Sequence, residues 1–180
     1  LVTHFDHDHF YPGWVKPIEK RGIRVHLHLR HRNRAMRTGL SGGAMHLFET
    51  PFDVACDIRV VPVRLSHDQL GSIGFVIEHG GVRLGWATDL GRVPGALVQE
   101  FTDLDALAIE SNYDRRMQMR SGRPDFLIRR ITGGGGHLSN EQSLRAVRMI
   151  ESKSPCLRNV VALHLSEECN SPRLVHELYH

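Results

Sequence analysis

The first nine residues of the chain contain closely spaced side chains that can bind metal ions. They include His4, Asp6, Asp8 and His9. Alternate residues at the end of a strand point to the same side, so His4 and Asp6 can bind one cation together. Four ligands within six residues are too many for one ordinary tetrahedral site. A tight turn after Asp6 would therefore direct Asp8 and His9 to a second cation.

A histidine-rich surface loop or a purification tag would explain the same histidines without any function, because such tracts bind metal through composition alone. A tag, however, would not place aspartates at fixed spacing. Nor would it continue into the aromatic, turn-like segment 10–14, which reads Phe-Tyr-Pro-Gly-Trp. We interpret the N-terminal segment as part of an active site.

Three later segments each place one further candidate ligand just after an apolar strand. His67 follows the run 60–65, Asp89 follows 84–87, and His164 follows 160–163. A single histidine or aspartate in such a place is usually a cap or turn residue. Three of them, together with the N-terminal cluster, favour a metal centre built from distant parts of the chain.

With these residues the sequence resembles the metallo-β-lactamase fold hydrolases. Their motif usually reads Thr-His-x-His-x-Asp-His, and later strand ends supply single His, Asp and His ligands. The chain is most similar to the WalJ/YycJ type, a cytoplasmic bacterial branch associated with DNA exonuclease activity. The matching residues and stretches are Thr3, His4, Asp6, Asp8 and His9, then 66–68, 87–91, 107–114, 136–140 and 164–170, in the order of the family.

The resemblance implies an α/β (α+β) fold, the metallo-β-lactamase αββα sandwich, and two divalent metal ions. The expected ligands are His4, Asp6 and His67 for the first ion, and Asp8, His9 and His164 for the second, with Asp89 bridging. Asp6 stands where the family has a histidine. A carboxylate is a harder ligand than imidazole, so the expected preference shifts from zinc toward manganese or iron.

In this superfamily several strands of the first sheet normally precede the ligand-rich motif, whereas only Leu1 and Val2 precede Thr3. We therefore expect a single, partial metallo-β-lactamase-like domain over residues 1–180 that lacks the first strands of the N-terminal sheet. An incomplete sheet exposes an apolar face, so we expect low stability and low activity.

The expected reaction is hydrolysis of a phosphodiester by a metal-activated hydroxide, with nucleic acid as substrate and DNA favoured over RNA by the resemblance. Two cations about 3.5–4 Å apart lower the pKa of a bridging water and stabilise charge on the attacking and departing oxygens. We assign catalytic roles to Asp8, Asp89 and His137, and His137 would protonate the leaving alkoxide.

His137 follows the glycine run 133–136 and precedes a helix expected over 140–150. Glycines permit a tight turn, and Ser139 or Asn140 would cap the helix. A helix N-terminus also suits phosphate, and Asn112 follows a buried strand expected over 106–110. Ser139, Asn140 and Asn112 are therefore the expected substrate-binding residues.

Arginines supply most of the positive charge, although the net charge is only +3. Either of two groups could bind phosphates through paired hydrogen bonds. Since the chain has only three lysines, arginine would equally be its ordinary surface cation. The groups are Arg21, Arg24, Arg30, Arg32, Arg34 and Arg37, and Arg115, Arg116, Arg120, Arg123, Arg129 and Arg130.

Composition is that of a globular protein, with 41% hydrophobic and 24% charged residues. No apolar run approaches a membrane span. Cys56, Cys156 and Cys169 are far apart and odd in number, which fits a reducing cytoplasm. The sequence gives no indication of the oligomeric state.

Further strands are expected over 25–29, 52–63, 73–77 and 82–88, with a hairpin turn over 78–81 and a helix over 95–100. His26 and His28 should face solvent, because they alternate with apolar residues. Two other functions stay open. The same metals could hydrolyse a small ester, lactone, thioester or β-lactam, or the chain could be a catalytically silent metal-binding module.

Overall fold

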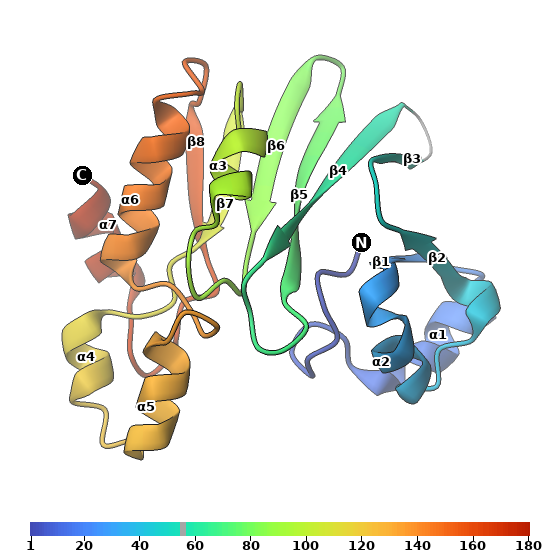
Figure 1. The fold of residues 1–180 in the computed structure, drawn as a ribbon, viewed down its shortest axis with the longest axis horizontal. Helices are drawn as coiled ribbons and strands as arrows, with labels where there is room; N and C mark the ends of the chain where they lie inside the picture. Colours follow the sequence, from blue (N-terminus) through green and yellow to red (C-terminus); the bar gives the residue numbers. More distant parts are fainter. Residues whose placement is uncertain (55–56) are drawn as a thin grey trace. The chain divides into compact units, whose positions relative to one another are not determined.

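The computed structural model describes residues 1–54 and 57–180, and it combines helices and sheets as predicted (Figure 1). The chain groups into two compact units, residues 1–52 and residues 53–180. We call them unit 1 and unit 2 and describe each by itself. The single-domain organisation stays a prediction.

Unit 1 contains two short parallel strands and several helical turns. Val25 pairs with Met45 and Leu27 with Leu47, while Val2 forms a bridge to Leu27. Its core includes Phe5, Phe10, Val25, Leu27, Ala35 and Leu40. The elements are η1 Pro12–Trp14, α1 Val15–Lys20, β1 Val25–His28, η2 Leu29–His31, α2 Arg32–Arg37, η3 Gly42–Ala44 and β2 Met45–Phe48.

The predicted exposure of the first strand is partly wrong. β1 ends at His28, and Leu29 begins the 3-10 turn η2 with 40% of its surface exposed. His28 is instead 2% exposed, and its Nδ1 accepts a hydrogen bond from the backbone of Arg30. The alternation breaks because the chain turns at His28, where the ring caps η2.

Unit 2 is built on one mixed sheet with the strand order β3-β4-β5-β6-β7-β8. β4, β5 and β6 are antiparallel neighbours, whereas β6, β7 and β8 are parallel. The elements are β3 Phe52–Val54, β4 Ile58–Leu65, β5 Ser72–His79, β6 Val82–Ala87, α3 Gly95–Glu100, β7 Ala106–Glu110, α4 Arg115–Met119, α5 Asp125–Thr132, α6 Asn140–Glu151, β8 Asn159–Leu163 and α7 Pro172–Tyr179.

The predicted strands of this sheet are confirmed, except that one of them is divided into two strands. The expected strand 52–63 corresponds to β3 and β4, and residues 55–56 between them lie outside the described residues, as does Cys56. Gly80 and Gly81 both have positive φ at the turn between β5 and β6, which is the backbone that a tight hairpin requires. Cys156 and Cys169 are free thiols.

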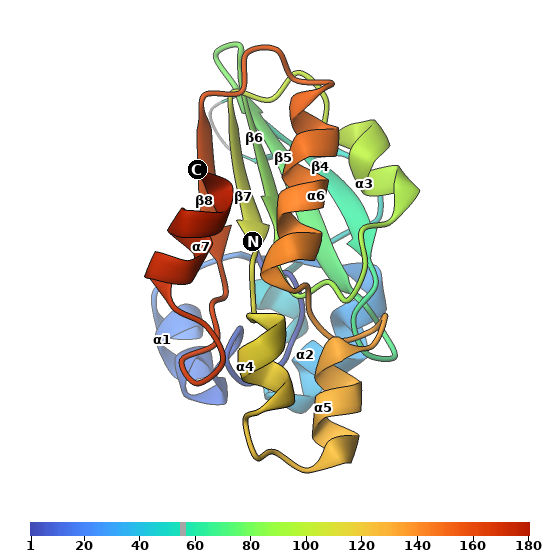
Figure 2. The same ribbon diagram turned by 90° about the vertical axis from the view of Figure 1, so that its left-hand side faces the viewer.

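Helices α3, α6 and α7 cover one face of the sheet, while α4 and α5 lie side by side beyond the edge where β7 and β8 end (Figures 1 and 2). The core under α3 and α6 includes Leu97, Phe101, Leu107, Val147 and Ile150. The helices of the described residues include none with the length and apolarity needed to span a membrane.

Candidate metal centre

The predicted N-terminal ligands lie together within unit 1. Backbone N–H groups of His9 and Phe10 both donate to the carbonyl of Asp6, at 2.9 Å each, which closes a tight turn. The turn brings the rings of His4 and His9 to a centroid distance of 4.3 Å. His4 Nε2 lies 3.7 Å from Asp6 Oδ2, and His9 Nε2 lies 3.6 Å from Asp8 Oδ2.

Thr3 orients both histidines of this turn. Its Oγ1 lies 3.1 Å from His4 Nδ1 and 3.4 Å from His9 Nδ1, so the Nε2 atom of each ring is the one turned toward the carboxylates. Hydrogen bonding at the second ring nitrogen is the usual means of fixing a metal-binding histidine. The predicted ligands of the motif therefore lie together and are oriented.

Arg34 adds a competing interaction that the sequence did not reveal. Its Nη1 donates to Asp6 Oδ1 at 3.1 Å, so the guanidinium already offsets part of the charge of that carboxylate. Nearby, burial lowers the pKa of His31 to about 4. His31 is therefore neutral at pH 7, whereas Arg34 is a charged group from α2 that contacts the turn.

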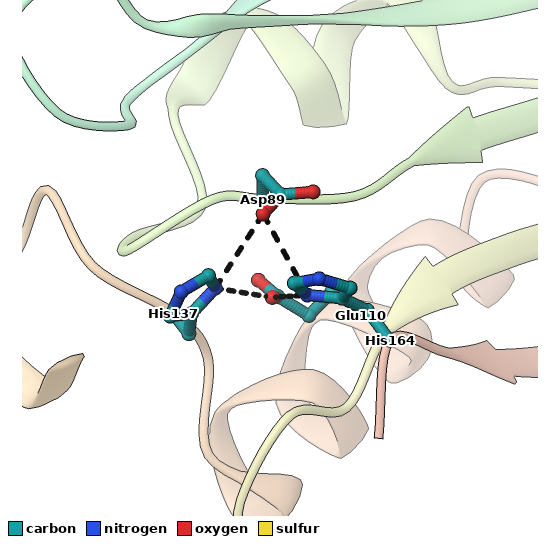
Figure 3. Close-up of side chains that lie close together, drawn as sticks. All are labelled: Asp89, Glu110, His137 and His164. Carbon is teal, nitrogen blue, oxygen red and sulfur yellow. Dashed lines mark hydrogen bonds and ion pairs between the residues drawn. The ribbon is translucent and has the colours of Figure 1, made fainter. Parts of the chain in front are cut away.

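In unit 2 the predicted ligands come from adjacent strand ends. Because β6, β7 and β8 are parallel neighbours, the residues that follow them meet at one edge of the sheet. Asp89 follows β6, Glu110 ends β7 and His164 follows β8, while His137 arrives from the loop between α5 and α6 (Figure 3).

Glu110 links the two histidines of this cluster. Its Oε1 lies 2.7 Å from His137 Nδ1 and 2.9 Å from His164 Nδ1 (Figure 3). Its Oε2 accepts hydrogen bonds from the backbone N–H groups of Leu90 and Leu138. The side chain is 0% exposed. A buried carboxylate requires such partners, since an uncompensated one is costly.

Asp89 completes the cluster from the opposite side. Its Oδ1 lies 3.6 Å from His164 Nδ1, and 3.8 Å from both His137 Nδ1 and His67 Nε2. Its Oδ2 accepts a hydrogen bond from the Thr88 hydroxyl at 2.9 Å. The structure therefore brings together the four unit 2 residues to which metal or catalytic roles were assigned.

Glu110 is the functional candidate that sequence reasoning missed. The sequence pattern places Glu110 at the end of the buried strand expected over 106–110 and assigns the chemical role after that strand to Asn112. The usable signal was a charged residue at the end of the otherwise apolar strand Ala106–Glu110. Full burial of a glutamate is rare unless the side chain is paired.

Three residues at or beside the cluster have left-handed backbone conformations. Asp89 and His164 have φ values of +56° and +57°, and Asp68, next to His67, has +40°. Such left-handed conformations cost side-chain-bearing residues roughly 1–3 kcal/mol and gather at functional sites. Asp89 and His164 have this conformation just after the ends of β6 and β8.

The glycine run before His137 is required by close packing. A Cβ on Gly136 would collide with the carbonyl oxygens of Arg130 and Ile131, and one on Gly91 would collide with the backbone of Gly136. The carbonyl of Gly136 in turn accepts a hydrogen bond from His67 Nδ1 at 3.0 Å. The run therefore positions His67 as well as His137.

The predicted substrate-binding residues occupy mainly internal positions. Ser139 caps α6 in a capping box with Gln142, as predicted. Asn140 is 2% exposed, and its amide is bonded to Ser111 and Asn170. Asn112 Nδ2 donates to the His164 carbonyl at 2.7 Å, so it holds the backbone of a candidate ligand. Their contact with substrate stays a prediction.

The donor set of unit 2 fits a divalent cation. Asp89, Glu110, His137 and His164 each place one ligand atom within 4.8 Å of the others. Two carboxylates and two imidazoles are a mixed oxygen and nitrogen set that suits zinc, manganese or iron.

With this geometry in place, comparison with known proteins identifies the family. The chain belongs to the family described as the Beta-lactamase superfamily domain, whose profile matches residues 1–164. It is similar to the exodeoxyribonuclease YycJ of Bacillus anthracis, with 29% identity over 119 residues, which are 66% of this chain and 44% of that protein. The predicted resemblance is confirmed, and the match spans less than half of this relative.

Solved structures confirm the predicted metallo-β-lactamase fold. YhfI from Bacillus subtilis, a metallo-beta-lactamase fold protein, gives a TM-score of 0.67 at 11% identity, over 97% of this chain and 66% of that chain. The short form of human tRNase Z gives a TM-score of 0.60 at 18% identity, over 92% and 71%. This fold implies divalent metal ions.

Proposed function

We propose that the chain carries the active site of a metal-dependent phosphodiesterase that hydrolyses nucleic acid, with DNA favoured over RNA. The observation that carries the proposal is the buried Glu110, which orients two histidines beside Asp89 at one edge of a parallel sheet. Family membership supports hydrolysis as the use of this cluster. The similar protein of Bacillus anthracis is named an exodeoxyribonuclease.

The proposed site holds two divalent ions, which would supply an activated water and stabilise charge on the reacting oxygens. We assign the ligands from the family motif. Glu110 and His137 belong to the same cluster as Asp89 and His164, but we propose an orienting role for Glu110 and a proton-donating role for His137. The proposed ligands are His4, Asp6 and His67 for one ion, and Asp8, His9 and His164 for the other, with Asp89 bridging.

His137 is the proposed proton donor to the leaving oxygen. Glu110 accepts a hydrogen bond from Nδ1 of His137, which fixes the orientation of the ring. The other ring nitrogen, Nε2, is then the atom that can give up a proton. The side chain is 20% exposed, in contrast to the fully buried glutamate behind it. The partial exposure of His137 supports this proposed role, because a proton donor has to reach the substrate.

The substrate class rests on charge and on the relative rather than on the metal cluster. Arg129, from the helix that leads into the His137 loop, is an exposed cation that suits an anionic ester. We also propose the cytoplasm as the location, because Cys156 and Cys169 are free thiols and a reducing compartment keeps them so.

Metal analysis combined with a hydrolysis assay tests the proposal. The whole chain is dialysed, reconstituted with manganese or zinc, and given single-stranded DNA, RNA and a small carboxylic ester as separate substrates. We expect two ions per chain and turnover of DNA that is lost in His67→Ala. The matched control is His79→Ala, which removes an exposed histidine at the end of β5.

Turnover of the ester alone would replace the nuclease assignment with the small-ester alternative. One ion or none, with no turnover of any substrate, would support a catalytically silent module. Equal cleavage of DNA by His67→Ala and His79→Ala would place the activity in another centre.

A further inference from the structure

Helices α4 and α5 form a strongly basic projection from unit 2. We call residues 114–132 the α4–α5 arm; the helices lie side by side in both views (Figures 1 and 2). The arm contains only two acidic residues, Asp114 and Asp125, and Asp114 is used to cap α4 through the backbone of Met117. Its cations are Arg115, Arg116, Arg120, Arg123, Arg129 and Arg130.

Two of these arginines attach the arm to segments that carry candidate ligands. Arg130 donates to Asp68 at 2.9 Å, beside His67, and Arg123 donates to Glu168 at 2.7 Å, in the loop that follows His164. The backbone N–H of His137 also donates to Ile131 of α5 at 2.8 Å. The base of the arm is therefore fixed next to the metal cluster of unit 2.

The other four arginines are exposed, and none of them has an ion pair with a carboxylate in the described part of the chain. Arg116 and Arg120 are one helical turn apart, so they lie on the same face of α4. Arg115 and Arg129 complete this set. Cations that no acidic side chain neutralises attract a polyanion, because binding releases its condensed counterions.

Phe126 adds an aromatic surface to these charges. It is 68% exposed, and Arg129 and Arg130 follow it by three and four residues, so all three share one face of α5. The other apolar residues of the helix, Leu127, Ile128 and Ile131, are half-buried. Bases of single strands stack on such exposed rings, and this stacking tolerates any sequence.

We propose that the α4–α5 arm binds single-stranded DNA, with its arginines on the phosphates and Phe126 against a base, and so leads the strand to the metal cluster. The inference rests on the proposed function for the identity of the polymer. An anionic membrane is the less suitable partner, because the apolar residues Leu127, Ile128 and Ile131 of α5 are half-buried, and the largely exposed Phe126 and Met119 lie on different helices.

Fluorescence anisotropy with a labelled oligothymidine tests the arm, with the whole chain kept in EDTA so that no strand is cut. Arg120→Gln/Arg129→Gln should raise Kd about tenfold and lower the log–log salt slope by about 1.4, since each lost phosphate contact removes roughly 0.7 for a single strand. The matched control is Arg145→Gln/Arg148→Gln, which removes two exposed arginines of α6.

Phe126→Ala should raise Kd about tenfold at unchanged salt slope, and Phe126→Trp should restore binding, because stacking is independent of ionic strength to first order. Equal weakening by the arm pair and the α6 pair would overturn the inference, because it would show attraction by net charge alone. Binding of the chain to anionic vesicles or to an acidic peptide in place of the oligonucleotide would overturn it as well.

Failure of the arm and failure of the proposed function give different results. If the chain hydrolyses DNA but the arm variants keep the KM of the α6 control, the arm inference is wrong and the nuclease proposal stands. If the arm variants lose binding in EDTA but the metal-loaded chain cuts no DNA, the arm binds the strand and the hydrolytic proposal is wrong.

Discussion

The two clusters of candidate ligands in this chain are assembled in different ways. In unit 1 a local turn gathers His4, Asp6, Asp8 and His9, and the side chain of Asp8 keeps 65% of its surface exposed. In unit 2 the topology of three parallel strands gathers Asp89, Glu110 and His164, and both carboxylates are buried. The first set depends on sequence proximity and the second on the whole sheet.

The neighbours of the carboxylates differ as well. Asp6 is paired with Arg34, a permanent cation, so part of its charge is offset in the absence of metal. Glu110 instead accepts hydrogen bonds from imidazoles and backbone amides. We expect the buried set to depend more strongly on a bound cation, because buried negative charge gains more from one than exposed charge does.

The largest expected effect is at Asp89, the proposed bridge. Asp89→Asn keeps the shape of the side chain but removes its charge, so at least one ion should be lost. Turnover of DNA should fall on the order of a thousandfold, since charge stabilisation by a metal is worth several kcal/mol. Metal content by elemental analysis and kcat are measured beside Asp53→Asn, an exposed control. Full metal content in Asp89→Asn would show that Asp89 is not a bridging ligand.

Glu110→Gln tests whether the buried carboxylate acts through the histidines. Positioning groups of this kind typically contribute about 10–100-fold, so we expect a loss of kcat in that range and a changed pH profile, with KM little affected. The control is Glu100→Gln on α3, where the residue is exposed. Thermal melting distinguishes a folding defect from a loss of catalysis. If the variant keeps the parent's melting temperature and an unchanged pH profile, Glu110 has no positioning role.

Asp6→His probes the turn of unit 1. An imidazole is a softer ligand than a carboxylate, so the ratio of zinc to manganese affinity should rise about tenfold by competition titration. Arg34→Gln is the companion variant, because it removes the ion pair and keeps the carboxylate. This variant should bind manganese more tightly, while the ligand at position 6 is still a carboxylate. A ratio that Asp6→His does not move would mean that Asp6 is no ligand.

The smallest expected effect lies in unit 1 outside its ligand turn. Burial, followed by the neighbouring His46, lowers the pKa of His26 to about 4 from the ordinary value of 6.5. The unfolded chain therefore binds more protons between these values, so stability should fall as pH drops from 6.5 toward 4. In metal-free buffer, the melting temperature of His26→Phe should fall less between pH 7 and pH 5 than that of the parent chain.

His26→Phe keeps the aromatic stack on Phe52, where the ring planes lie 11° apart, so packing is largely preserved. His79→Phe, at an exposed position, is the control and should follow the parent. An identical pH dependence in all three proteins would show that His26 does not titrate with folding in this range.

The contrast between the sets also explains what the sequence could predict. The turn residues were recognised from spacing alone, because their contacts are local. Asp89 and His164 were recognised because each follows an apolar run, and α6 with its Ser139 cap followed from the usual signals. The fold itself came from the resemblance, since no local pattern determines the order of strands in a sheet.

The contacts of Glu110 and Arg34 could not be predicted from the sequence because their partners are distant. The histidines that contact Glu110 lie 27 and 54 residues away, and Asp6 lies 28 residues from Arg34. The burial of His28 was missed for a related reason, since the end of β1 depends on where the chain turns. Such features depend on three-dimensional packing, which a period-two pattern cannot specify.

The four bonds accepted by Glu110 have a consequence for local opening of the protein. The carboxylate joins the segment after β6, the loop before α6 and the segment after β8, so none of these can detach without leaving a buried charge uncompensated. The amide protons of Leu90 and Leu138 should therefore exchange with deuterium at matching rates. Their shared protection would report on the integrity of the whole centre without any substrate.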